Sequence, residues 1–525
     1  MTPDQERALA QLAGRRYFIA LADFDSEDWR RRGVASIVAH ASPPGTTGGV
    51  VMLHDGGGNR SQTVATVRRL IPLLRSRGFL LVTMSELAGL PQSTTEPAAG
   101  SGPHRRGQVF VYSVRIAYAL IGSFTGLMIA IGIIVALRAA LLITLATHHT
   151  RRARGQVAAE HLPEVVLIVP AFNEAVGIAR TVTTLAESDY PNLDVVVVDD
   201  GSTDDTAAIV TALGHERVRL IRQDNAGKAS ALNTGLLHSS AEVVVMVDGD
   251  TLFEPNTVRE LVAPLVDPEV GAVSGNTKVG NRRSLLGRWQ HIEYVMGFNL
   301  DRRMYDVLQC TPTVPGAVGA FRRELLERVG GIPTDTLAED TDLTLAIGRT
   351  GKRVVYAEDA RAWTEAPSTL TSLWRQRYRW SFGTMQAIWK HRSALFSRDP
   401  RDTRIGRRAL PYLVLFQIVL PIASPLIDLF ALYGLIFTDP VRVILIWAAF
   451  NMIQVGIAAF GFRLDRESMR PLWALPLQQF VYRQLMYLVI IEATASALRG
   501  ARSGWKHIPR TGDAVIGPVS SAGGA

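Results

Sequence analysis

The sequence predicts an α/β domain inserted between transmembrane helices and preceded by a smaller, truncated α/β domain. Long apolar runs on both sides of a large polar region indicate the membrane part. Within that region, residues 163–395, apolar strand-like segments alternate with helical ones, which is typical of a parallel α/β sheet. Carboxylates follow two of these strands, at the end where open α/β sheets bind their ligands. The chain has 525 residues, enough for two or three domains.

Four apolar runs are long enough to cross a bilayer. Residues 116–137 carry no charge, and a helix needs about 20 residues to span the hydrocarbon core. Further runs lie at about 409–437, 441–463 and 473–498. A soluble protein with four such segments would have more core than its surface could cover. The sequence therefore predicts an integral membrane protein.

The basic residues lie mostly beside the apolar runs. The net charge is +8, and clusters such as "RRARG" at 151–155 and "RIGRR" at 404–408 follow the positive-inside pattern of membrane proteins. We therefore expect no nucleic-acid partner. The single cysteine, Cys310, excludes an intramolecular disulfide framework and a thiolate metal cluster. The opening "MTPDQERALA" has neither the basic start nor the apolar segment of a cleavable signal peptide.

Composition divides the chain into six regions. We expect a partial α/β domain at 1–90, a Gly/Pro/Ser/Thr-rich linker at 91–108, an N-terminal membrane region at 109–147, the large α/β domain at 160–395, a C-terminal membrane region at 405–500, and a basic then flexible tail at 501–525.

The large α/β domain shows a regular alternation of elements. Its expected strands are residues 164–170, 194–200, 217–222 and 242–250, and helical stretches such as 177–188 and 228–239 lie between them. Strands separated by helices pair in parallel, so the sequence predicts a parallel sheet with helices packed on it.

Paired acids follow two of these strands. Asp199 and Asp200 end the second strand, and Asp248 and Asp250 end the fourth. Residues two apart in a strand point to the same side, so the last two carboxylates can converge on one ligand, and Gly249 lets that ligand approach the backbone. Close carboxylates repel, and Mg²⁺ or Mn²⁺ held together with a substrate diphosphate would relieve this. A surface turn is the alternative interpretation.

The motifs of the domain, taken in order, resemble those of the processive family-2 inverting glycosyltransferases, a group that includes cellulose, chitin, hyaluronan and poly-N-acetylglucosamine synthases. The resemblance covers roughly residues 110–512 and rests on "VPAFNE" (169–174), "VDDGSTDDT" (198–206), "NAGKASALNTG" (225–235), "DGD" (248–250), "AED" (338–340) and "QRYRW" (376–380). It implies a GT-A (Rossmann-like) glycosyltransferase domain, a UDP-sugar donor, a growing polysaccharide acceptor and a membrane domain that passes the polymer out.

The resemblance places the donor site at the strand ends. A carboxylate accepts hydrogen bonds from uracil N–H or sugar hydroxyl groups, an aromatic ring stacks on the base, and a lysine at a helix start favours phosphate. For Phe172 the alternative role is core packing, and for Lys228 it is a solvated surface position. The implied donor-binding residues are Phe172, Glu174, Asp199, Asp200, Lys228, Asp248 and Arg379, and the implied Mg²⁺ or Mn²⁺ ligands are Asp248 and Asp250.

Asp340 is the candidate general base. An inverting transfer needs a base that takes the proton from the acceptor hydroxyl as this group attacks the anomeric carbon. The stretch 338–351 is predicted to be a helix that begins near Asp340, so a helix N-cap is the structural alternative. The resemblance favours catalysis, although Ala338 stands where the motif usually has threonine.

The "QRYRW" motif lies in a predicted helix, residues 370–389. Gln376, Arg379 and Trp380 share one face, because residues three and four apart are neighbours on a helix. Arg379 can brace the leaving diphosphate, and Trp380 can stack on a sugar ring. The resemblance ties Gln376, Arg377 and Trp380 to acceptor binding and processivity, and an interfacial aromatic and basic helix is the alternative.

The N-terminal region resembles the last third of a polysaccharide deacetylase. "DFDSEDW" (23–29) would supply Asp28, and "VVMLHDGGGNRSQTV" (50–64) would supply His54. The early metal-binding segments of that family do not appear, and without the metal no water is activated. We therefore expect a vestigial, inactive domain. Its fusion to a synthase points to an N-acetylglucosamine polymer, made from UDP-N-acetylglucosamine; hyaluronan, chitin oligomers and glucan stay open as products.

Two further functions and the topology complete the expectations. A non-processive glycolipid-forming transferase and a catalytically silent glycan-binding membrane protein are the alternatives. Nucleotide sugars are cytosolic, so the transferase domain should face the cytoplasm of a multi-pass plasma-membrane protein, with residues 1–90 outside. Three crossings after the domain would place the tail 501–525 outside, against the distribution of its Lys and Arg residues. The side of the tail therefore stays open.

Overall fold

The computed structural model describes residues 20–56, 59–91, 101–153, 162–437, 439–500 and 512–517. The chain divides into two compact units, Met1–Phe124 and Thr125–Ala525. The predicted tail therefore lies largely outside the described residues.

The first unit contains a small α/β arrangement. Strands β1 (Phe24–Asp25) and β2 (Val51–Met52) pair in parallel. Its core is small, and Val38 and Ala41 pack there against Leu70 and Leu74. The helices of this unit up to residue 91 are η1 (Asp28–Arg30), α2 (Val34–His40), α3 (Ser61–Ser76) and α4 (Met84–Leu87).

Helix α6 (Ser101–Ala153) runs from the first unit into the second. It begins inside the predicted linker and extends past the expected membrane region, and its segment Arg105–Arg151 is long and apolar enough to cross a membrane. In the second unit, the Arg138 guanidinium lies 2.7 Å from the Asp301 carboxylate and donates to the Tyr412 hydroxyl at 2.6 Å. This ion pair fixes the C-terminal part of α6 to the α/β domain.

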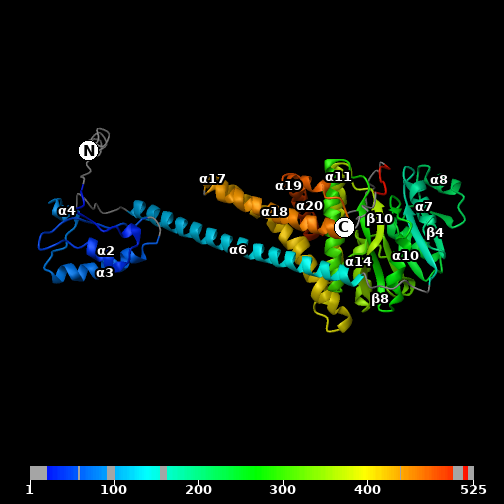
Figure 1. Ribbon diagram of the computed structural model, residues 1–525, viewed down its shortest axis with the longest axis horizontal. Helices are drawn as coiled ribbons and strands as arrows, with labels where there is room; N and C mark the ends of the chain where they lie inside the picture. The colour runs from blue at the N-terminus through cyan, green and yellow to red at the C-terminus, as the bar shows by residue number, and fades with distance from the viewer. Residues whose placement is uncertain are drawn as a thin grey trace, which may run out of the picture. The chain divides into compact units, whose positions relative to one another are not determined.

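The α/β domain contains an eight-stranded mixed sheet with the order β5-β4-β3-β6-β9-β8-β10-β7. Figure 1 labels its strands β4, β8 and β10 and the helices α7, α10 and α14 beside them. The first four strands of this domain, β3 to β6, pair in parallel, as the sequence predicts. Strand β9 pairs antiparallel with β6 and β8, and β7 pairs antiparallel with β10. The strands are β3 (Val165–Ala171), β4 (Leu193–Asp200), β5 (Val218–Gln223), β6 (Val243–Met246), β7 (Leu252–Phe253), β8 (Val270–Val279), β9 (Gly319–Arg322) and β10 (Arg353–Thr364).

Helices cover both faces of this sheet. Alternate residues of β3 enter opposite cores, with Leu167 in one and Ile168 in the other, which explains the unbroken apolar run of this strand. Helices α7 (Ile178–Ala186) and α10 (Thr257–Val262) pack in the first core, and α9 (Lys228–Leu237), α13 (Arg323–Arg328) and α14 (Glu339–Arg349) pack in the second. The remaining helices of the domain are α8 (Thr206–Ala212), η2 (Ala263–Val266), α11 (Leu285–Val295), η3 (Met296–Leu300), α12 (Asp301–Val307) and α15 (Leu370–His391).

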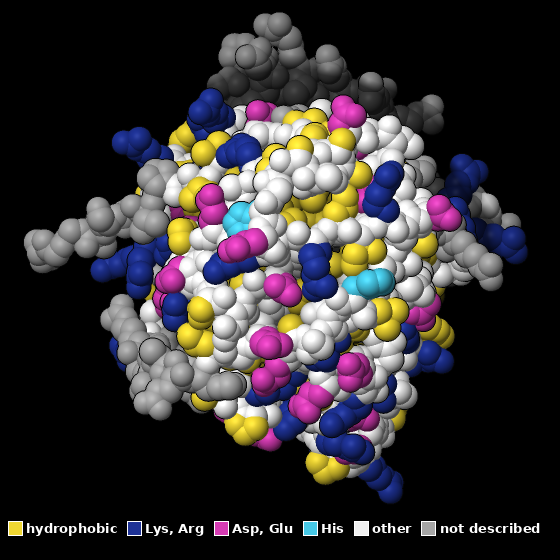
Figure 2. Space-filling model, turned by 90° about the vertical axis from the view of Figure 1, so that its right-hand side faces the viewer, with side chains coloured by type: hydrophobic (Ala, Val, Ile, Leu, Met, Phe, Trp, Pro, Cys, Tyr) yellow, Lys and Arg dark blue, Asp and Glu magenta, His cyan; other side chains and the backbone are white. Residues whose placement is uncertain are grey.

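The outer surface of the domain is of mixed charge. Figure 2 shows the face at the α8 end of the sheet, where acidic and basic side chains are interspersed. One exposed pair there joins neighbouring strands, with Arg219 and Asp194 3.4 Å apart.

Among the described residues, three helices are long and apolar enough to cross a membrane: Arg105–Arg151, Pro400–Phe437 and Pro440–Leu464. The fourth predicted run, 473–498, does not form a single long helix. Pro476 lies at the start of the short helix α19, and a turn at 479–481 separates α19 from the last helix, α20, which has 17 residues and lies against α15. The C-terminal elements are η4 (Arg392–Leu395), η5 (Pro400–Asp402), η6 (Ile405–Ala409), α16 (Leu410–Leu413), η7 (Val414–Val419), α17 (Leu420–Phe437), α18 (Pro440–Leu464), η8 (Arg470–Ala474), α19 (Leu475–Gln478) and α20 (Tyr482–Leu498).

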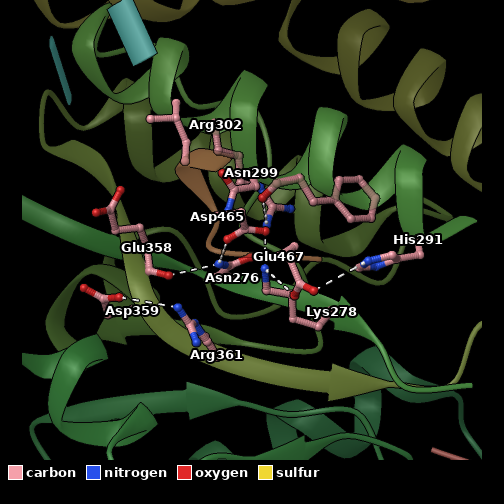
Figure 3. Close-up of polar contacts among 12 residues, drawn as sticks. Asn276, Lys278, His291, Asn299, Arg302, Glu358, Asp359, Arg361, Asp465 and Glu467 are labelled. Atoms are coloured by element: carbon pink, nitrogen blue, oxygen red, sulfur yellow. Dashed lines mark hydrogen bonds and ion pairs between the residues drawn. The ribbon is translucent and has the colours of Figure 1, made fainter. Parts of the chain in front are cut away.

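A buried polar cluster attaches the loop after α18 to the sheet (Figure 3). Asp465 pairs with Lys278 and accepts a hydrogen bond from the Asn276 amide at 3.0 Å. Glu467 lies 3.4 Å from the same lysine and 3.0 Å from the Arg282 guanidinium. Lys278 is only 2% exposed, so these carboxylates compensate a charge that strand β8 buries.

Residues 512–517 return to the α/β domain. The Gly512 N–H donates to the Glu365 carboxylate at 2.9 Å, and Ala514 is buried against Leu252 and Trp363. The end of the described chain therefore packs on the sheet edge formed by β7 and β10.

Candidate active site

Two adjacent cavities lie at the carboxyl ends of the central strands. The smaller has a volume of about 100 Å³ and the larger about 460 Å³. Lys228, Asp248 and Arg379 line both, so these three side chains mark their junction.

The smaller cavity collects the predicted donor residues. It is lined by the loop after β3, the end of β4, the start of α9 and the turn after β6. The predicted donor and metal residues along its wall are Phe172, Glu174, Asp200, Lys228, Asp248, Asp250 and Arg379.

Asp200 shapes the loop that leads to Lys228. Its carboxylate accepts the backbone N–H groups of Ala226 at 2.9 Å and Gly227 at 2.8 Å, and the Gln223 amide at 2.6 Å. Gly227 has φ +90°, a conformation that side chains with a Cβ rarely adopt. Asp200 thus both lines the cavity and holds the turn that begins α9.

Asp199 lies elsewhere, although the sequence analysis placed it in the donor site. Its side chain is buried away from both cavities and accepts the Ser202 N–H at 3.1 Å and the Arg222 guanidinium at 3.3 Å. Consecutive residues of a strand point to opposite sides, so Asp199 and Asp200 lie on opposite faces of β4, and Asp200 alone of the two lines the smaller cavity.

Asp248 and Asp250 lie in the turn after β6 rather than in the strand, because β6 ends at Met246. Both nevertheless line the smaller cavity. Asp250 accepts the Thr364 hydroxyl at 3.3 Å. Among the described residues, no group of three or more His, Cys, Asp or Glu side chains is arranged to hold a metal ion. A cation bound here would need oxygen ligands from the substrate in addition to the two carboxylates.

Lys228 connects the two cavities electrostatically. Its ammonium lies 2.7 Å from the Asp248 carboxylate and 2.8 Å from that of Glu339. Burial opposes this charge, but the two carboxylates outweigh it and raise the pKa of Lys228 above its usual value. Gly316 leaves room for the pair, since a Cβ there would lie 2.6 Å from the Lys228 nitrogen. The sequence analysis did not predict Glu339, whose only signal was its place beside Asp340.

Asp340 lies in the wall of the larger cavity, in the first turn of α14. The helix N-cap is Ala338, so Asp340 does not fill the structural role considered above. Its carboxylate accepts the Thr341 N–H at 2.7 Å. Burial, followed by the charge of Glu339, raises the pKa of Asp340 to about 6, although Lys228 opposes the shift. A carboxylate with this proton affinity suits a general base.

The residues of "QRYRW" lie along the larger cavity. Gln376, Arg377, Arg379 and Trp380 all contribute to its wall. Arg377 is buried and pairs with Glu293 at 2.5 Å, and its guanidinium covers the Trp380 ring at 4.1 Å. A sugar ring would therefore have to stack on the opposite face of that tryptophan.

The larger cavity extends to the apolar helices. Gln417, Ile418 and Pro421 line it from the candidate membrane segment Pro400–Phe437, and Met486, Val489 and Ile490 line it from α20. One continuous space thus connects Asp340 with helices that can lie in a membrane.

Asp28 and His54 lie together in the first unit. The His54 ring nitrogen Nδ1 is 2.7 Å from the Asp28 carboxylate, which also accepts the Thr63 hydroxyl at 2.6 Å. Burial would raise the pKa of Asp28, but these hydrogen bonds outweigh it and hold the pKa well below the usual range.

Residues 163–383 match the family model described as "Glycosyltransferase like family 2". They include the whole sheet, both groups of strand-end carboxylates, Asp340 and the "QRYRW" motif. This part of the chain is a family-2 glycosyltransferase domain with a GT-A-like α/β fold, and the predicted class of enzyme is confirmed at the level of the family.

Among curated proteins, the chain is similar to poly-beta-1,6-N-acetyl-D-glucosamine synthases. It is 27% identical to that of Staphylococcus aureus over 266 residues, which are 50% of this chain and 63% of the relative. It is 26% identical to that of Staphylococcus epidermidis over 359 residues, 65% of this chain and 85% of the relative. The match to the first of these relatives thus spans less than two thirds of its length.

Among solved structures, a mannosyltransferase from Pyrobaculum calidifontis in complex with GDP-Man and Mn²⁺ is similar to this chain. The sequence identity is 28%, the TM-score is 0.49, and the match covers 69% of this chain and 99% of that structure.

Proposed function

We propose that the chain is a membrane-bound, inverting, processive glycosyltransferase. It transfers sugar units from a UDP-sugar, most simply UDP-N-acetylglucosamine, to a growing β-linked polysaccharide and helps to export it. The main support is the cavity of about 460 Å³ that joins Asp340 to the candidate membrane segment Pro400–Phe437. A non-processive enzyme needs no such space beyond its acceptor site.

The donor binds in the smaller cavity. Phe172 stacks on the base, and Glu174 and Asp200 accept hydrogen bonds from the base and ribose. Lys228 and Arg379, at the junction of the cavities, neutralise the diphosphate. Asp199 lines neither cavity, so we assign it no direct contact with the donor.

Asp248 and Asp250 would hold Mg²⁺ or Mn²⁺ together with the diphosphate oxygens. Hard divalent cations prefer such oxygen ligands, so the two side chains fit the ion. The cation would stabilise the negative charge of the departing diphosphate. We expect EDTA to stop transfer and added Mn²⁺ or Mg²⁺ to restore it in a radiolabelled transfer assay. Full activity in EDTA would contradict a metal at these two carboxylates.

Asp340 acts as the base of the transfer. It takes the proton from the acceptor hydroxyl while that oxygen forms a bond to the anomeric carbon. The bond from this carbon to the diphosphate oxygen breaks on the opposite face, so the configuration inverts and UDP leaves. The raised pKa of Asp340 supports this role, because the base must accept a proton during the step.

The choice of sugar rests on the similarity to poly-beta-1,6-N-acetyl-D-glucosamine synthases. The purified full-length chain in lipid nanodiscs should be incubated with UDP-N-acetylglucosamine, UDP-glucose and UDP-glucuronate, and its products sized by gel filtration. We expect a long polymer from the first donor alone. Polymer made from another donor would identify that donor as the substrate in place of UDP-N-acetylglucosamine. Single additions to lipid would indicate a glycolipid-forming transferase. Absence of both transfer and donor hydrolysis would indicate a glycan-binding protein.

The proposal includes two further expectations. Residues 1–90 are an inactive deacetylase remnant, in which the contacts of Asp28 with His54 and Thr63 are structural. The glycosyltransferase domain faces the cytoplasm of a plasma-membrane protein, where nucleotide sugars are available. One crossing by α6 then places residues 1–90 outside.

A further inference from the structure

Glu293 occupies the wall of the larger cavity at the meeting point of three helices. It belongs to α11, and its carboxylate accepts hydrogen bonds from the Arg377 guanidinium of α15 at 2.5 Å and from the Tyr482 hydroxyl of α20. Arg377 also approaches that hydroxyl, at 3.4 Å. One carboxylate therefore joins the "QRYRW" helix to the helices on either side of it.

Arg377 also contacts two of the predicted acceptor-binding residues. Its guanidinium donates to the Gln376 side-chain oxygen at 2.5 Å and lies 4.1 Å from the centre of the Trp380 ring. Phe298 packs on the same tryptophan, with ring centres 5.7 Å apart, and contacts Tyr294 at 4.4 Å. The ring is thus held by the guanidinium and by an aromatic pair beside α11.

The charge of Glu293 is needed for this arrangement. Arg377 is 4% exposed, and burial of a guanidinium without a counter-charge is costly. Burial lowers the pKa of Arg377, but Glu293 outweighs it and keeps the group charged. Glu293 itself is partly exposed, with 31% of its side chain accessible, and it lines the larger cavity. The pair therefore belongs to the acceptor space rather than to the apolar core.

We propose that Glu293 is a positioning residue for the acceptor chain: through Arg377 it fixes the Gln376 amide and the Trp380 ring in the orientation that binds the sugar. The inference rests on the proposed function, because it assigns Glu293 to the acceptor side of that same site. Glu293 does not line the smaller cavity, so we assign it no role in donor binding.

The test compares Glu293→Gln with a matched substitution, Glu492→Gln. Glu492 joins α20 to α15, since it accepts the Trp374 indole N–H at 2.8 Å, but it does not line either cavity. For Glu293→Gln we expect the KM of an added oligosaccharide acceptor to rise about tenfold, because the substitution weakens hydrogen bonds to a charged group; a tenfold change is ~1.4 kcal/mol, near the lower end of what such a bond contributes. The KM of the UDP-sugar should change less than about twofold, well below that effect, and the product should be shorter. Glu492→Gln should leave all three unchanged.

Two variants establish the route of the effect. Tyr482→Phe removes one hydroxyl from the cluster and should raise the acceptor KM in the same direction but less. Trp380→Ala should raise it as well, and Glu293→Gln added to Trp380→Ala should raise it little further, because the tryptophan that Glu293 positions is gone. Equal effects of Glu293→Gln in both backgrounds would overturn the route through Trp380.

The outcomes separate the two proposals. If the wild-type chain makes polymer and Glu293→Gln has unchanged acceptor KM and product length, the role of Glu293 is wrong and the proposed function stands. If Glu293→Gln changes the KM of donor and acceptor alike, its role is structural. If the wild-type chain makes no polymer from any donor, the proposed function itself fails.

Discussion

Lys228 interacts with three carboxylates, those of Asp248, Glu339 and Asp340. The proton affinity of Asp340 therefore depends on its neighbours as well as on burial. Glu339 and Asp248 raise the pKa of Asp340, whereas Lys228 lowers it. A base at this junction can respond to the negative charge of a bound diphosphate.

Replacement of Asp340 by Asn should lower the rate of transfer by a factor of about 10² to 10⁴, because the amide cannot take the proton from the acceptor hydroxyl. UDP affinity, measured by calorimetry, should stay nearly unchanged. In the unsubstituted enzyme, kcat/KM should fall about tenfold per pH unit below pH ~6, since protonation of Asp340 removes the base. A loss of UDP affinity equal to the loss of rate would contradict the assignment.

Replacement of Glu339 by Gln should move this acid limb to lower pH. The substitution removes the neighbouring negative charge that raises the pKa of Asp340, while the amide oxygen can still accept a hydrogen bond from Lys228. The pH dependence of kcat/KM measures the shift. Glu269→Gln, at an exposed ion pair with Lys352, is the matched control and should leave the profile in place. An acid limb of kcat/KM that moves to higher pH would contradict this prediction and would show that the changed position of Lys228 outweighs the removed charge.

The elements that place these residues differ in how strongly they are held. Strands β3 and β4 are buried on both faces, whereas the loop after α18 is fixed by the polar contacts of Asp465 and Glu467 with β8 (Figure 3). That loop fixes the C-terminal end of α18 to the α/β domain.

Replacement of Asp465 by Asn should lower the stability of the second unit by about 3 kcal/mol, because it leaves the buried Lys278 charge with Glu467 as its remaining ion-pair partner. Thermal unfolding in detergent should show a lower Tm. Asp194→Asn, at the exposed pair with Arg219, should change stability by less than about 1 kcal/mol. Equal effects of the two substitutions would contradict the anchoring role.

Local pattern was sufficient for some elements and not for others. Strands β3 and β4 are unbroken apolar runs, and helices α14 and α15 begin and end near their predicted bounds. Strands β7 and β9 have two and four residues, and their antiparallel pairing is set by partners distant in sequence. The last apolar run, 473–498, was expected as one segment but forms the short helix α19 and the 17-residue helix α20, because Pro476 begins a new helix and a turn follows it.

The same distinction applies within the site. Asp200, Asp248, Asp250 and Asp340 could be predicted because strand ends and motifs mark them. Glu293 could not, since its partner Arg377 is 84 residues away and only the fold brings the two together. For the adjacent acids Asp199 and Asp200, the sequence could not show which side chain lines the cavity, and the structure identifies Asp200.

At the level of the whole molecule, the proposal gives a topology that can be measured. Fluorescent and alkaline phosphatase reporters fused after residue 90 should report the external side, and those fused after residue 300 the cytoplasm. The reason is that the described residues between these two positions contain one candidate span, Arg105–Arg151. A cytoplasmic signal from the first position, or an external one from the second, would contradict this arrangement.

The segment 512–517, which packs beside Glu365 and Trp363, also constrains the membrane region. A chain that leaves the α/β domain and later returns to it must cross the bilayer an even number of times in between. The two candidate spans Pro400–Phe437 and Pro440–Leu464 would supply such a pair of crossings. With these two crossings alone, α20 would run along the membrane surface or enter it without crossing, and residues 512–517 would share the compartment of Asp248, Asp250 and Asp340.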